Sequence, residues 1–443
     1  MTYAAPTTFE KKMFNNLNLH YVQPIRSFNR NARLFLLMIV VDGVIFSGWQ
    51  LFFNIYMLQN GFDRAFLGLV NSLPSLAGLF FSIPIGFLSD RIGRKASLII
   101  GLATASVFML VQVSSQNTTV IAVAAFLTGV FSMLFIVSQA PLMMKLSTPE
   151  NRTMLFSLQF GLQTLAGAVG AVFAGQLPAL FGGLLQIAAD SATAYRAVLI
   201  TSVVLGTSAV IPIWMMHETR AASDEGDASA SASPRAGSQR EALSWSLIPL
   251  VVKMNVPQIL IGFGAAVLIP YMNVFFKDRF NISDAGLGIM FSLSSLLVGV
   301  GSILAPRLSV VLGGKVRAVV VTQFASLLFL LTIGFVPVMW IAAAGFLFRG
   351  ALMNMSSPLY SAFCMERTPE KHQGFVNSVL SVSWNVGWAV GPYISGIVQE
   401  RYGFTPLFIT TATLYFIAIL STWNFFVRNE SGQEIVATEV AAS

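Results

Sequence analysis

Long apolar stretches alternate with short polar segments along almost the whole chain. Each stretch holds about 20 residues, which is enough for a helix to cross a hydrocarbon core of roughly 30 Å. The twelve stretches cover residues 33–57, 65–87, 96–114, 119–145, 154–180, 196–216, 254–276, 285–306, 318–338, 340–362, 374–398 and 406–427. The pattern therefore predicts an all-α membrane protein with twelve transmembrane helices.

Composition agrees with this prediction, since hydrophobic residues make up 55% of the chain and charged residues only 10%. An average water-soluble domain has about 25% charged residues. The net charge of +7 would suggest nucleic-acid binding in a soluble protein. Here the basic residues stand in short loops beside the apolar stretches, where they set membrane orientation. We therefore expect a lipid bilayer as the partner and no nucleic acid.

The distribution of Lys and Arg predicts which side each loop faces. If the N-terminus is cytoplasmic, about 20 of the 26 Lys and Arg residues fall on the cytoplasmic side and about 5 on the other. Both termini are therefore expected to be cytoplasmic, in a multi-pass protein of the cell inner (cytoplasmic) membrane. No N-terminal apolar stretch precedes a small-residue cleavage site, so no signal peptide is expected.

The segment 218–242 differs from its surroundings, because Ala, Ser, Gly and charged residues replace the apolar ones. Such a composition predicts a flexible cytoplasmic linker between two six-helix halves, 33–217 and 243–427. A cytoplasmic N-terminal segment, 1–32, and a cytoplasmic tail, 428–443, complete the predicted organisation.

The two halves repeat one another in sequence. Residues 67–69 match 287–289, and residues 148–150 match 368–370, both at a shift of 220 residues. Separated matches at one shift indicate two copies of one six-helix unit. An even number of helices in each unit makes the copies parallel, related by an axis along the membrane normal.

The connection between the second and third stretches reads Gly86-Phe87-Leu88-Ser89-Asp90-Arg91-Ile92-Gly93-Arg94-Lys95. It resembles the signature loop of the major facilitator superfamily (MFS), G-x-L-[SA]-D-R-x-G-R-[RK], and it stands at the same place in the topology. With the twelve stretches, the linker and the duplicated halves, the resemblance covers nearly the whole chain. It implies the MFS fold and a secondary transporter that works by alternating access.

In the family this loop is thought to latch the two halves together on the cytoplasmic side while the cavity opens outward. The resemblance therefore implies a conformational role for Gly86, Asp90, Arg91, Gly93 and Arg94. The second half has lost the acid of this loop, because Val310 replaces it. Asp90 is able to cap a helix N-terminus or to pair with a cation of the other half. The alternative, a positively charged topology anchor, explains the arginines but neither Asp90 nor the glycines.

Two charged residues lie well inside predicted helices, Asp42 in the first and Arg349 in the tenth. A charge at the bilayer centre costs about 2.5 to 3.5 kcal/mol on insertion scales, so such residues face a wet cavity or a partner. By the family resemblance helices 1, 4, 7 and 10 line the central cavity, so we expect both residues to face it. A direct pair between them is possible but not required. In the functional interpretation they bind a proton or the substrate; the alternative is a structural ion pair or a hydrated carboxylate.

Polar and aromatic residues of the predicted helices complete a candidate substrate cavity. They are Trp49, Gln50, Asn54, Gln139, Tyr271, Asn273, Asn354, Tyr360, Trp384, Asn385 and Trp388. A mixed aromatic and amide lining suits an amphipathic organic ligand better than a small inorganic ion. The alternative for each residue is helix packing or an interfacial anchor.

The sequence thus predicts a monomeric secondary transporter of a small organic solute, and first of all proton-coupled efflux of an amphipathic compound. Proton-coupled or facilitated uptake of a metabolite is the alternative. A transport-inactive membrane sensor or a membrane-embedded enzyme is a remote alternative. The chain has no nucleotide-binding loop, no Cys/His cluster and no second carboxylate inside a predicted helix, so neither an enzymatic activity nor a cofactor or metal is expected.

Overall fold

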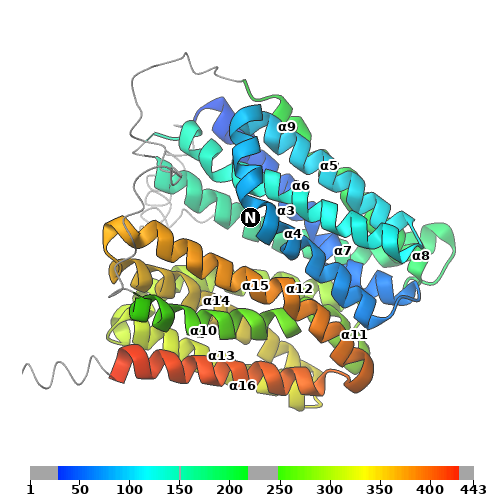
Figure 1. Ribbon diagram of the computed structural model, residues 1–443. Coiled ribbons are helices and arrows are strands. Elements are labelled where there is room, and N and C mark those ends of the chain that lie inside the picture. Colours follow the sequence, from blue (N-terminus) through cyan, green and yellow to red (C-terminus); the bar gives the residue numbers. More distant parts are fainter. Residues whose placement is uncertain (1–27, 149–150, 218–247, 429–443) are drawn as a thin grey trace, which may run out of the picture.

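The computed structural model describes residues 28–148, 151–217 and 248–428, which are helical apart from short turns (Figure 1). Within these ranges the chain forms no β-strand, so the all-α prediction is confirmed there. The predicted linker 218–242 and most of the two terminal segments lie outside the described residues.

The described helices fall into two sets, one on each side of residues 218–247. The first set is α3 (Arg30–Gln59), α4 (Arg64–Ile92), α5 (Arg94–Ser114), α6 (Thr118–Leu146), α7 (Arg152–Leu185), α8 (Ala192–Thr207) and α9 (Val210–Trp214). The second set is α10 (Ile248–Leu268), α11 (Met272–Phe280), α12 (Asp284–Val311), α13 (Lys315–Phe335), α14 (Met339–Glu366), α15 (Glu370–Tyr402) and α16 (Thr405–Thr422). A 3₁₀ turn, Ile269–Tyr271, joins α10 to α11, and a π-helical turn, Trp423–Val427, follows α16.

Each predicted stretch coincides with one helix or with a broken helix. The sixth stretch is split into α8 and α9, and the seventh into α10 and α11. Among the described residues, ten helical segments are long and apolar enough to cross a membrane. The helices α14 and α15 do not reach that hydropathy, because amide and hydroxyl side chains replace apolar ones along them.

Local signals set the helix boundaries. The Asp63 carboxylate accepts a hydrogen bond from the N–H of Phe66 at 2.6 Å, and Ser283 caps α12 in the same way. These caps satisfy donors that the first helical turn leaves unpaired. At the other ends of α4 and α12, Gly93 and Gly313 have φ values of +90° and +72°, a region that favours glycine. The α4–α5 and α12–α13 connections are therefore short.

The helices form two bundles with the same internal pairing. We call α3–α9 the N-bundle and α10–α16, with the two short turns, the C-bundle. In the N-bundle α3 packs on α7 and α8, α4 packs on α6, and α5 packs on α6. In the C-bundle α10 packs on α15 and α16, α12 packs on α14, and α13 packs on α14. The bundles contact one another through α4 with α15 and through α7 with α12.

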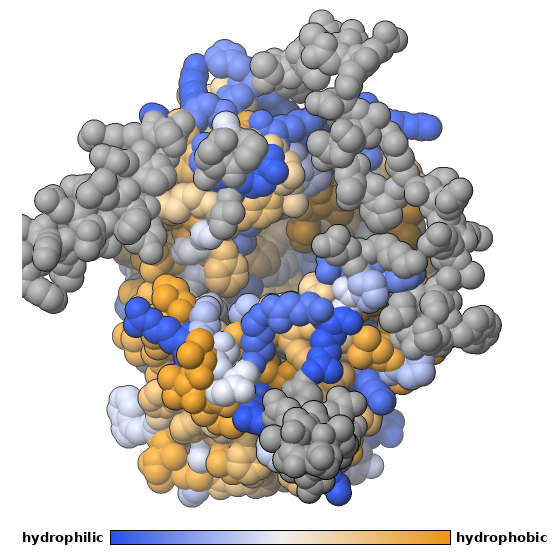
Figure 2. All heavy atoms as spheres, turned by 90° about the vertical axis from the view of Figure 1, so that its left-hand side faces the viewer, coloured by the Kyte–Doolittle hydropathy of each residue, from blue (hydrophilic) through white to orange (hydrophobic). Residues whose placement is uncertain are grey.

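The bundles converge at one end of the molecule and separate towards the other. Figure 1 shows them meeting on the right, beside α8 and α11, and we call this end the closed face. Every hydrogen bond between the bundles in the described chain belongs to this end. The opposite end, with the turns at Gly93 and Gly313, is the open face. Figure 2 looks at the open face and shows a hollow between the bundles.

Two pairs of glycines let the bundle backbones approach near the closed face. A Cβ on Gly68 would lie only 3.0 Å from the Cα of Gly396, where α4 meets α15. A Cβ on Gly288 would lie only 2.9 Å from the Cα of Gly175, where α12 meets α7. Such small residues permit close helix contact in lipid. Gly68 and Gly288 occupy corresponding positions of the 220-residue repeat, so the two crossings are equivalent.

Candidate functional site

A cleft with a volume of about 370 Å³ lies between the two bundles, where α3 and α7 face α12 and α14. We call it the interbundle cleft. Polar side chains from all four helices line it, namely Asp42, Ser47, Gln50, Gln163, Thr164, Ser294, Ser295 and Asn354. Three of the predicted cavity residues, Asp42, Gln50 and Asn354, therefore lie together on its wall.

Asp42 is the acidic residue of this cleft, and it is partly buried. Within the described residues its carboxylate forms neither a hydrogen bond nor an ion pair. The packing of α3 on α7 fixes the backbone at Asp42. A Cβ on Gly43 would lie only 3.0 Å from the Cβ of Ala166, so the two helices approach closely there. Ser47 Oγ also donates a hydrogen bond to the carbonyl oxygen of Gly167 at 2.9 Å. A rigid scaffold thus presents a carboxylate that is available for a proton or a cation.

Arg349 does not share the cleft with Asp42, and the prediction that both face one cavity is corrected. Its side chain is only 5% exposed, and Nη2 donates to the hydroxyl of Tyr415 at 2.6 Å inside the C-bundle. The guanidinium lies 5.7 Å from the centre of the Tyr415 ring. Helix geometry explains the difference, since five residues separate Arg349 from Asn354, which is a rotation of about 140° around α14. The possible pair with Asp42 is absent.

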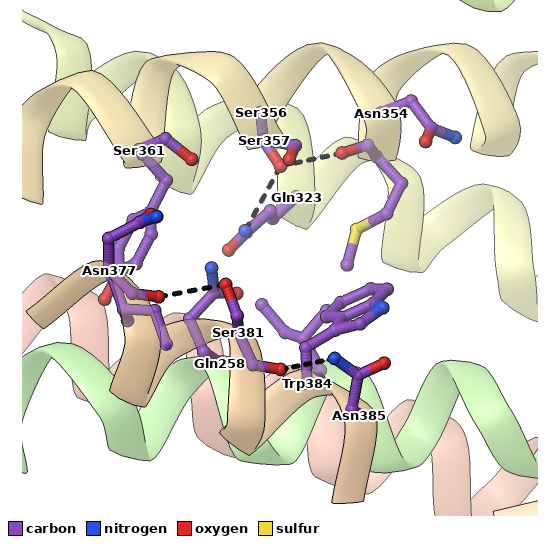
Figure 3. A pocket seen from close by; sticks show the side chains of 14 residues that line it. Gln258, Gln323, Asn354, Ser356, Ser357, Ser361, Asn377, Ser381, Trp384 and Asn385 are labelled. Atoms are coloured by element: carbon purple, nitrogen blue, oxygen red, sulfur yellow. Dashed lines mark hydrogen bonds between the residues drawn. The ribbon is translucent and has the colours of Figure 1, made fainter. Parts of the chain in front are cut away.

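A second pocket, of about 360 Å³, is built by the C-bundle alone (Figure 3). Its walls come from α10, α13, α14 and α15, and it adjoins the interbundle cleft at Asn354, which lines both. Four of the predicted cavity residues lie here: Asn354, Tyr360, Trp384 and Asn385. We call this space the amide pocket, because amide side chains dominate its polar lining.

Sequence reasoning missed other residues of the amide pocket. They are Gln258, Gln323, Ser356, Ser357, Ser361, Asn377 and Ser381. A spacing signal does exist for some of them. On α14 the polar residues at 354, 357 and 361 recur at i, i+3 and i+7, and on α15 those at 377, 381 and 385 recur every four residues. Both spacings place polar groups on one helix face.

Asn54 and Asn273, which we predicted to line the cavity, instead join the bundles at the closed face, and Tyr271, predicted to do the same, forms its bond within the C-bundle. Asn54 Nδ2 donates to the carbonyl oxygen of Pro270 at 2.6 Å, and Asn273 Nδ2 donates to that of Leu51 at 2.8 Å. The hydroxyl of Tyr271 donates to a backbone carbonyl of α15 at 2.9 Å. All three side chains are buried. They lie at the helix ends beyond the cleft, where the bundles are already in contact.

The other predicted residues lie around these spaces. Trp49 stacks on Phe53 with ring centres 4.4 Å apart and lines a small apolar pocket beside Asp42. Gln139 accepts a hydrogen bond from Gln159 Nε2 at 3.4 Å between α6 and α7. Trp388 lies next to Trp384, with ring centres 6.4 Å apart. The Nε1 of Trp388 is buried and has no hydrogen-bond partner in the described chain.

The loop that resembles the family signature makes its contacts within the N-bundle. The Asp90 carboxylate pairs with Arg94, one helical turn away, and Arg94 Nη1 donates to Ser89 Oγ at 2.9 Å. Arg91 is exposed, and Gly93 supplies the left-handed turn before α5. A Cβ on Gly86 would meet its nearest neighbour only at 4.0 Å, so packing does not require a glycine there in this state. Asp90 here contacts neither a helix N-terminus nor a described cation of the C-bundle.

Charged groups that the sequence did not single out join the bundles at the closed face. Arg64 of α4 binds Asp278 of α11 at 2.6 Å. Tyr195 of α8 donates to Asp284 of α12 at 3.0 Å, and Asp284 also pairs with Lys277 at 2.5 Å. Arg64 and Asp284 occupy corresponding positions of the 220-residue repeat but carry opposite charges. An alignment of the two halves reveals this change of charge in the sequence.

Comparisons with known proteins agree with this architecture. The family model of the Major Facilitator Superfamily matches residues 34–253 and 256–441. Multidrug resistance protein MdtG of Dickeya zeae is 26% identical over 423 residues, which are 92% of this chain and 97% of that protein.

Two solved structures share the fold at low sequence identity. A bacterial homologue of the human lysosomal transporter Spinster, in an inward-facing and occupied conformation, has a TM-score of 0.70 and 12% identity, and the match covers 88% of this chain and 95% of that one. The nucleoside transporter NupG has a TM-score of 0.69 and 14% identity, over 89% and 99% of the two chains. The family and these relatives are transporters rather than enzymes. The chain therefore belongs to the Major Facilitator Superfamily, as a multi-pass membrane transporter of small molecules.

Proposed function

We propose that this transporter exports amphipathic organic compounds from the cytoplasm in exchange for protons. The observation that carries the proposal is the Asp42 carboxylate, which lines the interbundle cleft without a described partner. Intramembrane carboxylates in such clefts are typical of proton relays. The 26% identity to a relative named as a multidrug resistance protein supports the choice of cargo.

The proposed mechanism is alternating access between two halves, 33–217 and 243–427, joined by the linker 218–242. Twelve helices span the membrane in this proposal, with both termini in the cytoplasm and a single chain as the working unit. The excess of Lys and Arg on the loops of the open face supports a cytoplasmic open face. The described state is then inward-facing, and Asp42 exchanges its proton with whichever side the cleft faces.

The substitution Asp42→Asn tests proton coupling in proteoliposomes, with labelled tetraphenylphosphonium as the cargo. We expect transport driven by a pH gradient to be lost, because the amide binds no proton at neutral pH. Exchange of cargo at equal pH on both sides should persist. The matched control is Asp190→Asn, which changes an exposed carboxylate in the α7–α8 turn. Gradient-driven transport at the rate of the parent protein would exclude Asp42 as the coupling residue.

Uptake of a metabolite is the second candidate, because amide and serine side chains make up most of the lining of the amide pocket. The same proteoliposomes distinguish the two directions. Accumulation driven by a pH gradient that is acidic on the side from which the cargo enters indicates symport. Accumulation driven by a gradient that is acidic on the side where the cargo collects indicates exchange. A protein that shows no counterflow of any labelled solute would be a sensor or an enzyme instead.

We also propose that Asp90, with Gly86, Arg91, Gly93 and Arg94, forms a latch on the open face in the opposite state. The Asp90 side chain is half exposed, and its pairing with Arg94 leaves it able to exchange partners. Asp90→Ala should increase thiol labelling of a cysteine placed in the interbundle cleft. Glu366→Ala is the control, since it removes an ion pair with Lys315 on the same face but within the C-bundle. Equal labelling in both variants would contradict the latch.

A further inference from the structure

The amide pocket is free of charged residues along its whole lining. Its fourteen lining residues include five amides, four serines and a tryptophan, and none of them is an acid or a base. The interbundle cleft, by contrast, contains Asp42. The two adjoining spaces therefore offer different chemistry, since a charged cargo group gains a countercharge only in the cleft.

Gln323 gives the amide pocket a polar atom that needs a partner. Its side chain is 5% exposed, and Nε2 donates to Ser356 Oγ at 3.3 Å. The Ser356 hydroxyl donates its own hydrogen to the carbonyl oxygen of Met353 at 2.7 Å, so it can only accept from Gln323. This arrangement fixes the amide orientation and leaves Gln323 Oε1 buried, without a hydrogen-bond partner in the described chain. A buried acceptor of this kind is costly until a donor reaches it.

Two further amides line the same space. Asn354 Nδ2 donates to the carbonyl oxygen of Gly350, and Asn385 Nδ2 donates to that of Ser381, both at 2.9 Å. Each amide commits one of its two N–H groups to its own helix and leaves its oxygen and the other N–H available. Figure 3 shows the labelled side chains of α14 and α15 facing one another across the pocket. A ligand hydroxyl or N–H group in this space can therefore satisfy Gln323 Oε1, the buried acceptor without a partner in the described chain.

Trp384 adds a flat apolar surface beside these acceptors. Its side chain lines the pocket and is 38% exposed, so part of the ring is accessible to a ligand. The volume of about 360 Å³ lies in the range of small-molecule sites, roughly 300 to 1,000 Å³. The space thus accommodates one ring with its substituents.

We propose that the amide pocket binds the uncharged, hydroxyl-bearing ring of an organic cargo, with the ring against Trp384 and a donor on Gln323 Oε1. The inference rests on the proposed transport function and adds that cargo and proton occupy different bundles. Asp42 in the N-bundle carries the proton, and the C-bundle selects the cargo. An uncharged cargo then binds without displacing the proton from Asp42.

The test uses the full chain in lipid nanodiscs and titration calorimetry with two probes. The first, 4-nitrophenyl β-D-glucopyranoside, is uncharged and rich in hydroxyl donors; the second, tetraphenylphosphonium, is a cation without donors. Gln323→Leu should weaken glycoside binding about tenfold, because leucine keeps the volume but accepts no hydrogen bond. Tetraphenylphosphonium affinity should remain within about twofold in this variant. Glycoside affinity unchanged by Gln323→Leu, or no glycoside binding to the parent protein, would overturn the proposal.

Two serines of α15 provide a matched pair that does not disturb a buried side chain. Ser378 and Ser381 are both exposed, and each hydroxyl donates to the carbonyl four residues earlier at 2.9 Å. Only Ser381 lines the amide pocket. Ser381→Ala should weaken glycoside binding about threefold and Ser378→Ala should leave it unchanged. Equal affinities in the two variants would count against the pocket even if Gln323→Leu fails to fold.

Asp42→Asn separates this inference from the proposed function. We expect it to leave glycoside affinity within about twofold of the parent protein, because Asp42 does not line the amide pocket. Loss of glycoside binding in this variant would show a shared site and overturn the inference. Glycoside binding as expected, in a protein that shows no pH-driven transport, would instead contradict the proton coupling and leave the pocket assignment intact.

Discussion

At the closed face ion pairs and hydrogen bonds link the two bundles, whereas the ion pairs between described residues at the open face each lie within one bundle. Arg64 reaches Asp278, and Tyr195 reaches Asp284, from one bundle to the other. At the open face Asp90 pairs with Arg94 in the N-bundle, and Lys315 pairs with Glu366 in the C-bundle. The described state is therefore held together from one end. The open face keeps its charges in pairs that can be exchanged.

The closed face also differs in how closely the backbones pack. The glycine crossings of α4 with α15 and of α7 with α12 bring main chains into contact, and the asparagines of α3 and α11 seal the space between them. Backbone packing of this kind responds to the addition of one carbon atom, whereas an exposed ion pair contributes little. The comparison of the two faces therefore ranks the following substitutions.

Gly396→Ala should have the largest effect on the closed face. A Cβ there would lie 2.2 Å from the backbone oxygen of Arg64, which cannot move without its helix. Overpacking costs about 1–3 kcal/mol, which shifts the population away from this state roughly 5- to 150-fold. The distance between spin labels in the α3–α4 and α11–α12 turns should lengthen, as measured by double electron–electron resonance. Gly374→Ala on the same helix is the control, because its Cβ would meet nothing within 4 Å.

Asp284→Asn should have an intermediate effect. The side chains of Lys277 and Asp284 are 19% and 11% exposed, so solvent screens their pair only partly. The substitution removes that pair and weakens the bond from Tyr195, at a cost of about 1–2 kcal/mol. Cysteine labelling in the closed face should rise accordingly. A double-mutant cycle with Tyr195→Phe should show coupling between the two residues, and strictly additive effects would place the hydroxyl outside this contact.

Asp278→Asn should have the smallest effect of the three. The Arg64 and Asp278 side chains are 26% and 42% exposed, and exposed pairs contribute only about 0.2–1 kcal/mol. The thermal unfolding temperature should fall by a small amount at low salt and by less at high salt, because ions screen the pair. An effect larger than that of Gly396→Ala would reverse the ranking and make charge, rather than packing, the main closing force.

The hydrophobic pattern predicted the helices well, because a stretch of about 20 apolar residues has one stable form in lipid. The family resemblance assigned the central cavity to helices 1, 4, 7 and 10, and of the polar and aromatic residues proposed for that cavity, Asp42, Gln50, Asn354 and Trp384 line the cleft or the amide pocket. The sequence records how deep each residue lies along its helix, and these four also face the right way.

Rotation around a helix and the state of the molecule were harder to predict. Arg349 was misplaced because its depth is compatible with the cavity while its direction is not. Asn54 and Asn273 were misplaced because the closed face covers them in this state, and a linear pattern contains no information on which end is closed. The unpaired acceptor Oε1 of Gln323 results from contacts between α13 and α14, which no local sequence pattern encodes.

The opposite charges of Arg64 and Asp284 have an evolutionary consequence. Two identical halves could have assembled as a symmetric dimer, with the same residues on both sides of the interface. An N-bundle facing a second N-bundle would now bring Arg64 against Leu58 and Ala179, the repeat counterparts of Asp278 and Glu400, and leave the Arg64 guanidinium and backbone N–H without these two carboxylates. Divergence after duplication has thus made each half dependent on the other.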